Sequence, residues 1–150
     1  MVMVVGRDLW FPSQMNETSS QKADALQERT FQFALRIIRF VDALPQTRQC
    51  ARPIGSQLVR SATSVGANYR AARRGRSRAE FIAKMCIVVE EADETLYWLK
   101  IAVGAGLIKP AQTEELIQES TELLAIFAKT RRTLRSERKL RVLTSSHRPA

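Results

Sequence analysis

Residues 74–80, Arg-Gly-Arg-Ser-Arg-Ala-Glu, mark a short turn between two long stretches of periodic apolar residues. Gly75 interrupts the pattern, and Ser77 precedes Glu80 by three residues, which is the spacing of a capping box. In that motif the serine side chain accepts a hydrogen bond from the backbone amide at the start of a helix. The stretch therefore predicts two helices, and its short link makes them antiparallel neighbours.

Both flanking stretches have the apolar spacing of amphipathic helices. The first covers about 52–73, with Pro53 in its first turn. Gly66 lies mid-helix, where glycine costs about 1 kcal/mol relative to alanine, so we expect a neighbouring helix to pack closely against it. The second continues to about residue 103, before Gly104 and Gly106. Its expected inner face comprises Phe81, Met85, Val88, Val89, Ala92, Leu96, Leu99 and Val103.

Two outer helices complete the expected fold. One runs over about 24–44, where Asp24 and Gln27 have capping-box spacing, and the other over about 110–136. We interpret 1–23 and 137–150 as flexible tails, the second of them basic. Four amphipathic helices with short links predict an all-α, antiparallel up-down-up-down four-helix bundle over 24–136.

The composition excludes several classes of protein. The chain has 150 residues, enough for one domain. Two cysteines and one histidine are too few for a disulfide framework or a zinc site. No apolar run approaches the roughly 18 residues of a membrane span, so we expect a cytoplasmic protein with no membrane partner. The sequence contains no recognisable nucleophile–base set or phosphate loop, so we expect no enzyme, no catalytic residue, no cofactor and no metal.

The charge is strongly positive and unevenly placed. Lys and Arg number 24 and Asp and Glu 15, a net charge of +9, which favours a polyanionic partner. Residues 129–150 hold eight basic residues against Glu137 alone, so they carry +7 of this surplus. Arginine suits bidentate phosphate contacts. The candidate nucleic-acid contacts are Arg70, Arg73, Arg74, Arg76, Arg78, Arg131, Arg132, Arg135 and Arg138.

The bundle topology places both arginine clusters at one end, because the turn after the second helix and the end of the fourth helix lie together. The alternative for the first cluster is a solvated bundle end, where arginines offset the helix dipole. The alternative for the second is a solubilising tail.

The stretch Arg60-Ser61-Ala62-Thr63-Ser64-Val65-Gly66-Ala67-Asn68 resembles the signature of a bacterial four-helix-bundle family. That family includes proteins encoded within intervening sequences of 23S ribosomal RNA genes. The chain is also similar to the accessory protein of diversity-generating retroelements, over roughly residues 25–135. The structural signature residues are Arg60, Ser61, Ser64, Asn68 and Glu91.

The resemblance implies an up-down-up-down bundle, a homopentameric ring and no catalytic residues. For the retroelement branch it implies binding of nucleic acid and of a reverse transcriptase. A ribosomal component is the alternative partner to a reverse transcriptase.

The turn near residue 75 also predicts which residues face each other. Arg60 falls opposite Glu90, Glu91 or Glu94, where an ion pair would fix the helix register. If Arg60 meets this cluster, we expect Arg60→Met alone to destabilise the protein by about a few kcal/mol. A carboxylate metal site in the acidic cluster would need Glu-x-x-His pairs, which the chain lacks.

Apolar residues outside a single inner face predict a subunit interface. The first helix carries two apolar stripes more than about 100° apart, more than one partner layer covers. We expect one stripe and the outer side of the third helix to contact another subunit. The alternative is a wide core or cover by the N-terminal segment. The expected interface residues are Phe33, Ile37, Phe40, Ile87, Trp98 and Ile101.

We therefore predict a non-enzymatic homo-oligomer, most simply a pentamer, that binds the backbone of RNA or DNA through arginine-rich surfaces. The alternative is a protein-interaction scaffold whose basic face docks an acidic protein, a polymerase or a ribosomal partner.

Overall fold

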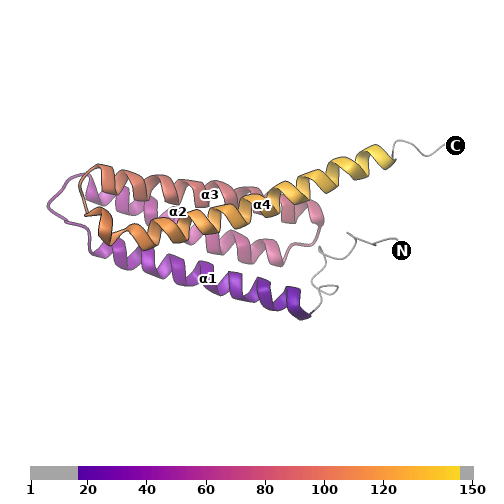
Figure 1. The fold of residues 1–150 in the computed structure, drawn as a ribbon, viewed down its shortest axis with the longest axis horizontal. Coiled ribbons are helices and arrows are strands. Elements are labelled where there is room, and N and C mark those ends of the chain that lie inside the picture. The colour runs from indigo at the N-terminus through magenta and orange to yellow at the C-terminus, as the bar shows by residue number, and fades with distance from the viewer. Residues whose placement is uncertain (1–16, 146–150) are drawn as a thin grey trace.

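The computed structural model describes the backbone of residues 17–145 and the side chains of residues 17–136. Within that range the chain forms four long helices and no strand. Their bounds are α1 (Glu17–Asp42), α2 (Ala51–Arg73), α3 (Arg78–Gly104) and α4 (Glu114–Ser145), with a short 3-10 turn, η1 (Pro110–Gln112), before α4. The helices alternate in direction and lie side by side (Figure 1), which confirms the up-down-up-down bundle.

The turn between α2 and α3 forms at the predicted place. Ser77 is the N-cap of α3, and its hydroxyl accepts a hydrogen bond from the Glu80 amide at 3.2 Å. The Glu80 carboxylate accepts from the backbone amide of Arg76 at 2.9 Å, one residue earlier than in a standard capping box. This local arrangement ends α2 and starts α3, with the Glu80 amide of the first turn satisfied by the Ser77 side chain.

The other end of α3 is closed by glycine, as predicted. Gly106 has a φ of +66°, a conformation that favours a residue without a Cβ. Its amide donates to the Val103 carbonyl and the Leu107 amide donates to the Ala102 carbonyl, which is the Schellman pattern. Leu107 is buried, so the chain turns directly towards η1 and α4.

The predicted outer boundaries of the bundle are wrong in two places. α1 begins at Glu17 and not at Asp24, so 17–23 is helix and not tail. No Gly or Pro interrupts this segment, and serine and threonine cost only a few tenths of a kcal/mol in a helix. α4 continues to Ser145, so the backbone of 137–145 is also helical. Residues 1–16 and 146–150, the rest of the expected tails, lie outside the described residues.

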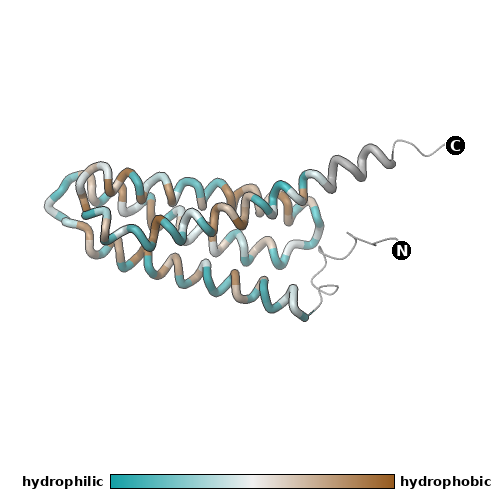
Figure 2. The backbone as a smooth tube through the Cα atoms, viewed as in Figure 1, coloured by the Kyte–Doolittle hydropathy of each residue, from teal (hydrophilic) through white to brown (hydrophobic). Residues whose placement is uncertain are grey.

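The core lies between the four helices and is filled by aliphatic and aromatic side chains. Figure 2 shows apolar and polar residues alternating along each helix, as amphipathic packing requires. The largest fully buried side chains include Ile37, Leu58, Met85, Leu99 and Phe127. On α3 the inner face is rotated slightly from the prediction: Phe81 and Val103 are half-buried, and the buried positions extend to Ile82, Thr95 and Ala102.

The four pairs of neighbouring helices differ in how extensively they pack together. α2 packs most extensively on α3, whereas α1 and α4 meet over a much smaller area. Ion pairs close this seam. Arg29 on α1 contacts both oxygens of Glu119 at 2.7 Å and one oxygen of Glu122 at 2.5 Å, and Arg36 contacts Glu115 at 3.1 Å. The α1–α4 seam is thus held in part by charge.

The seam makes the stability of α1 sensitive to pH and salt. Hydrogen bonds from Arg29 and Gln118 hold the pKa of Glu122 below its usual range. A lowered carboxyl pKa stabilises the fold above the ordinary pKa of about 4.3, and this contribution disappears as pH falls through the lowered value. We expect Arg29→Gln to lower the thermal midpoint at pH 7, and we expect this deficit to shrink as the pH falls towards 3 or in about 1 M salt.

Arg39→Gln is the matched control, because Arg39 is exposed on the same helix. Thermal unfolding by circular dichroism at both pH values measures the difference. If the Arg29 variant keeps the same deficit at pH 3 and in high salt, its effect comes from packing and the charged seam is refuted.

Candidate nucleic-acid interface

The two predicted arginine clusters lie at the same end of the bundle, as the topology predicted. The start of α1, the turn between α2 and α3 and the final turns of α4 all lie there (Figure 1). Contacts join these segments directly. Arg73 on α2 binds Asp24 on α1 at 2.6 Å, and Arg78 on α3 donates to the Leu134 carbonyl on α4 at 3.4 Å. Arg135 on α4 contacts the Cys86 sulfur on α3 at 3.5 Å.

The first cluster divides into two groups. Arg73 donates to the Ala23 carbonyl and to Gln27 as well as to Asp24, so its guanidinium joins α1 to α2. Asp24 and Gln27, which the sequence predicted as cap residues of α1, instead accept hydrogen bonds from this arginine. Arg78 is half-buried beside α4. These two arginines hold helices together. The exposed members of the cluster are Arg70, Arg74 and Arg76.

The second cluster lies on a helix and not on a flexible tail. Arg132 and Arg135 are exposed and Arg131 is half-buried. The side chain of Arg138 lies outside the described range, although its backbone is helical. α4 projects beyond the other three helices at this end (Figure 1), so its last turns form a helical arm.

α4 is strongly polarised along its length. Four of its five acids, Glu114, Glu115, Glu119 and Glu122, lie in the first three turns. Its basic residues begin at Lys129, and Glu137 is the single acid among them. The helix dipole favours this direction, but its influence reaches only the last turn. Arg132 and Arg135 lie two or more turns before Ser145, so dipole compensation does not account for them.

The signature residues connect α2 to α3. The Ser61 hydroxyl is fully buried 2.9 Å from that of Thr95, and each also lies within hydrogen-bond distance of a carbonyl on its own helix. The Asn68 amide donates to both the carbonyl and the hydroxyl of Ser64 at 3.0 Å, and its oxygen accepts from Lys84 at 3.4 Å. The signature thus describes how two helices meet.

Arg60 meets the acidic cluster where the register predicted. Its guanidinium contacts Glu91 at 3.3 Å and forms a second ion pair with Glu94. Hydrogen bonds from Arg60 and Trp98 hold the pKa of Glu94 below its usual range. The Arg60 side chain is 50% exposed, so this is not the buried pair on which the expected loss of a few kcal/mol depends. Exposed ion pairs contribute about 1 kcal/mol or less, so we expect Arg60→Met to cost correspondingly little. No group of three or more metal-ligating side chains occurs among the described residues.

The predicted subunit interface is wrong on α1. Phe33, Ile37 and Phe40 are 2%, 0% and 7% exposed, so they fill the core of one chain and are closed to a second. The other apolar stripe of α1 comprises Phe31, Ala34, Leu35, Ile38 and Val41. Ala34 is buried and Leu35, Ile38 and Val41 are half-buried, so only Phe31, at 55% exposed, reaches the open surface. On α3, the predicted residues Ile87, Trp98 and Ile101 are half-buried, and their contact with another subunit stays a prediction.

Sequence reasoning missed the two most exposed large apolar side chains among the described residues, Phe31 and Tyr97. Phe31 belongs to a groove of about 660 Å³ between α1 and α2. Leu35 and Ile38 continue its wall on α1, and Gly66 and Ala67 lie on α2. The signal was present, because the two stripes of α1 could not both be buried.

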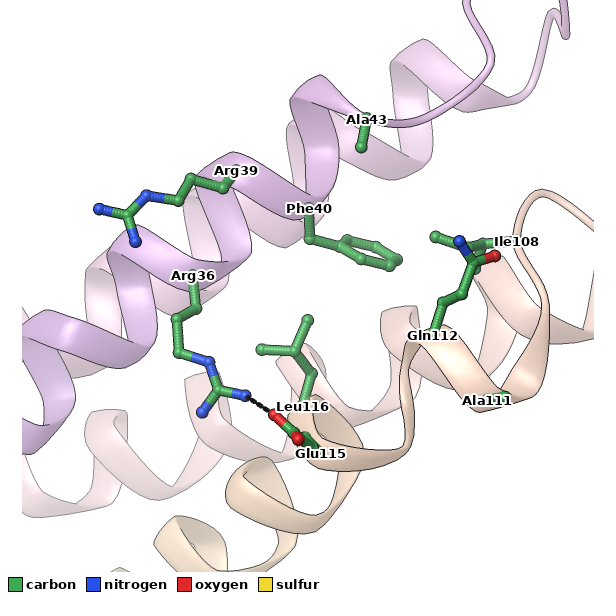
Figure 3. A pocket seen from close by; sticks show the side chains of 9 residues that line it. All are labelled: Arg36, Arg39, Phe40, Ala43, Ile108, Ala111, Gln112, Glu115 and Leu116. Carbon is green, nitrogen blue, oxygen red and sulfur yellow. Dashed lines mark hydrogen bonds and ion pairs between the residues drawn. The ribbon is translucent and has the colours of Figure 1, made fainter.

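A second hollow lies at the far end of the α1–α4 seam. It has a volume of about 530 Å³, and Phe40 and Leu116 form its apolar wall (Figure 3). Arg36 crosses its mouth to Glu115, whereas Arg39 extends away from the apolar wall. Because Arg36 and Glu115 are paired with each other, this cleft offers few polar partners to a ligand.

Fold and site together define a small, basic four-helix-bundle protein with an arginine-rich end. The family of 23S rRNA-intervening sequence proteins matches residues 22–129, and the chain belongs to this family.

A crystal structure from Bacteroides thetaiotaomicron, of a protein of unknown function from the S23 ribosomal protein family, has the same fold. It is 33% identical, with a TM-score of 0.68, and the match covers 74% of this chain and 98% of that one. Comparison with curated proteins gives no match. The family match ends at residue 129, so most of the basic arm lies beyond it.

None of the helices in the described part of the chain has the length and apolar character needed to cross a membrane.

Proposed function

We propose that this protein is a non-enzymatic homo-oligomer that binds the phosphate backbone of nucleic acid through its arginine-rich end. The observation that carries the proposal is the convergence of two exposed arginine groups from separate parts of the sequence. Arg74 and Arg76 come from the turn between α2 and α3, and Arg132 and Arg135 from α4. Side chains spread over two segments of one surface can contact several phosphates at once.

The chemistry of this end supports phosphate contacts more than base recognition. Arginine guanidinium groups match phosphate oxygens in pairs. The nearest tyrosine, Tyr69, is buried in the core, so it offers no ring to stack on a base. We therefore expect binding that depends steeply on salt and weakly on sequence.

The test compares three double variants of the full chain, each with two positive charges removed. One is Arg74→Gln with Arg76→Gln, and one is Arg132→Gln with Arg135→Gln. The control is Arg39→Gln with Arg52→Gln, two exposed arginines at the opposite end of the bundle. A truncation after Ala128 is less suitable, because it removes the buried Leu134 and the carbonyl that binds Arg78.

Fluorescently labelled single- and double-stranded RNA and DNA are titrated across a salt series. We expect each cluster variant to reduce the slope of log K against log salt by about 0.9 for each phosphate of duplex DNA that the variant no longer neutralises. The combination of both should weaken binding about tenfold or more at physiological salt, with little change in the control. No binding of the wild type at low salt, or an equally large effect in the control, would overturn the proposal and favour the scaffold alternative.

A further inference from the structure

The described surface carries two separate apolar patches, each centred on an exposed aromatic side chain. The first is the groove between α1 and α2, with Phe31 on its wall. The second lies on α3, where Tyr97 is 56% exposed and packs edge-on against Trp98 with ring centroids 5.1 Å apart. The patches occupy different helices and differ in shape: one is hollow, and the other presents a ring.

The groove has room for a ring from outside. Gly66 and Ala67 line it on α2, and these small residues leave space beside α1. Its volume of about 660 Å³ lies within the range that encloses small ligands and side chains. A Tyr97 ring placed there would bury apolar area on both surfaces.

Charges at the edges of the two patches are complementary. The groove has exposed Glu28 on its α1 side and exposed Arg70 on its α2 side. Tyr97 shares its face of α3 with exposed Asp93 and Lys100, at i−4 and i+3. A second copy of α3 across the groove can therefore place each of these charges near one of opposite sign, which favours this partner over an unrelated apolar one.

We propose that the α1–α2 groove of one copy receives the Tyr97 patch of the next copy in a head-to-tail contact. This inference rests on the homo-oligomer of the proposed function and specifies its surfaces. A contact of groove with groove would leave Tyr97 exposed on every copy, and a contact of Tyr97 with Tyr97 would leave the groove open. A contact between unlike patches covers both, and its repetition closes a ring or extends a filament.

The test uses Phe31→Arg and Tyr97→Arg in the full chain, with Ala125→Arg on the exposed side of α4 as the control. Both aromatic side chains are more than half exposed, so we expect each variant to fold, with circular dichroism as the check. Mass is measured by light scattering after size exclusion at matched concentration. Each variant alone should fall from a multiple of 17.0 kDa to the monomer, while the control keeps the wild-type mass.

Mixing the two variants separates the possible contacts. The Tyr97→Arg copy retains an intact groove, and the Phe31→Arg copy retains an intact Tyr97 patch, so an equimolar mixture should form a heterodimer of twice the monomer mass. A like-with-like contact would instead leave one variant assembled as the wild type, with no heterodimer in the mixture. An oligomeric wild type unaffected by both variants would overturn the proposed surfaces alone, and a monomeric wild type would overturn the homo-oligomer as well.

Discussion

Phe127→Ala should cost about 3–5 kcal/mol of folding free energy, the loss typical of a fully buried phenylalanine. Phe127 on α4 is 0% exposed, and its ring packs against that of Tyr69 on α2 at a centroid distance of 5.2 Å. It therefore joins two helices that are not neighbours in sequence, across the core. The truncation removes this ring packing and leaves a cavity that the surrounding helices fill only in part.

The loss should lower the thermal midpoint by about 6–20 °C for a chain of this length. Phe127→Leu is the matched control, because it keeps most of the apolar volume and should cost much less. Both are measured by chemical and thermal unfolding at one protein concentration, since assembly makes apparent stability depend on concentration. Equal midpoints for the alanine variant and the wild type would mean that α4 does not pack on the core through Phe127.

The inner pair of helices was predictable because local and periodic signals agree there. Ser77 and Glu80 fix the start of α3, and the apolar spacing on both sides identifies the faces that pack together. That register was enough to place Arg60 opposite Glu91 and Glu94. A sequence specifies one fold when its local signals, such as cap residues, and its apolar periodicity favour the same structure.

The outer helix ends depended on contacts that the sequence does not display. Asp24 and Gln27 have cap spacing, but Arg73 from α2 binds both and holds them inside α1. The same interaction decides which arginines remain available at the candidate site. Arg73 and Arg74 are neighbours in sequence, yet one joins two helices and the other is exposed. Successive residues on a helix point about 100° apart, so the orientation of α2 about its own axis decides that Arg73 faces α1 and Arg74 faces solvent.

The two stripes of α1 show the same limit. Each is apolar and each has helical spacing, so periodicity indicates that one is outward but not which one. Packing against α2 and the rest of the core settles it: Phe33, Ile37 and Phe40 are inside, and Phe31 is outside. The other stripe lines the groove through Phe31, Leu35 and Ile38, of which only Phe31 is more than half exposed.

The α1–α2 contact also identifies which glycine the fold requires. The sequence predicts close packing at Gly66, but a Cβ built there lies 3.5 Å or more from Thr30, an ordinary contact. At Gly55 the Cβ would lie 2.7 Å from the Val41 Cγ1 atom, closer than packed carbon atoms tolerate. Val41 is half-buried and β-branched, so its χ1 rotamer cannot change freely in a helix. Of the two glycines in α2, Gly55 is therefore the one whose lack of a side chain the contact with α1 requires.

Alanine at the two glycines should accordingly have opposite effects. Gly66→Ala should stabilise the protein by about 0.5–1 kcal/mol, because alanine is the better helix former and has room. Gly55→Ala gains the same propensity but overpacks the interface at a cost of about 1–3 kcal/mol, so we expect a net loss. In a Val41→Ala background the clashing methyl is absent, and Gly55→Ala should change sign and stabilise.

Unfolding midpoints of the four proteins in the Val41–Gly55 cycle measure this coupling directly. A coupling energy near zero would show that α1 and α2 are not in close contact there.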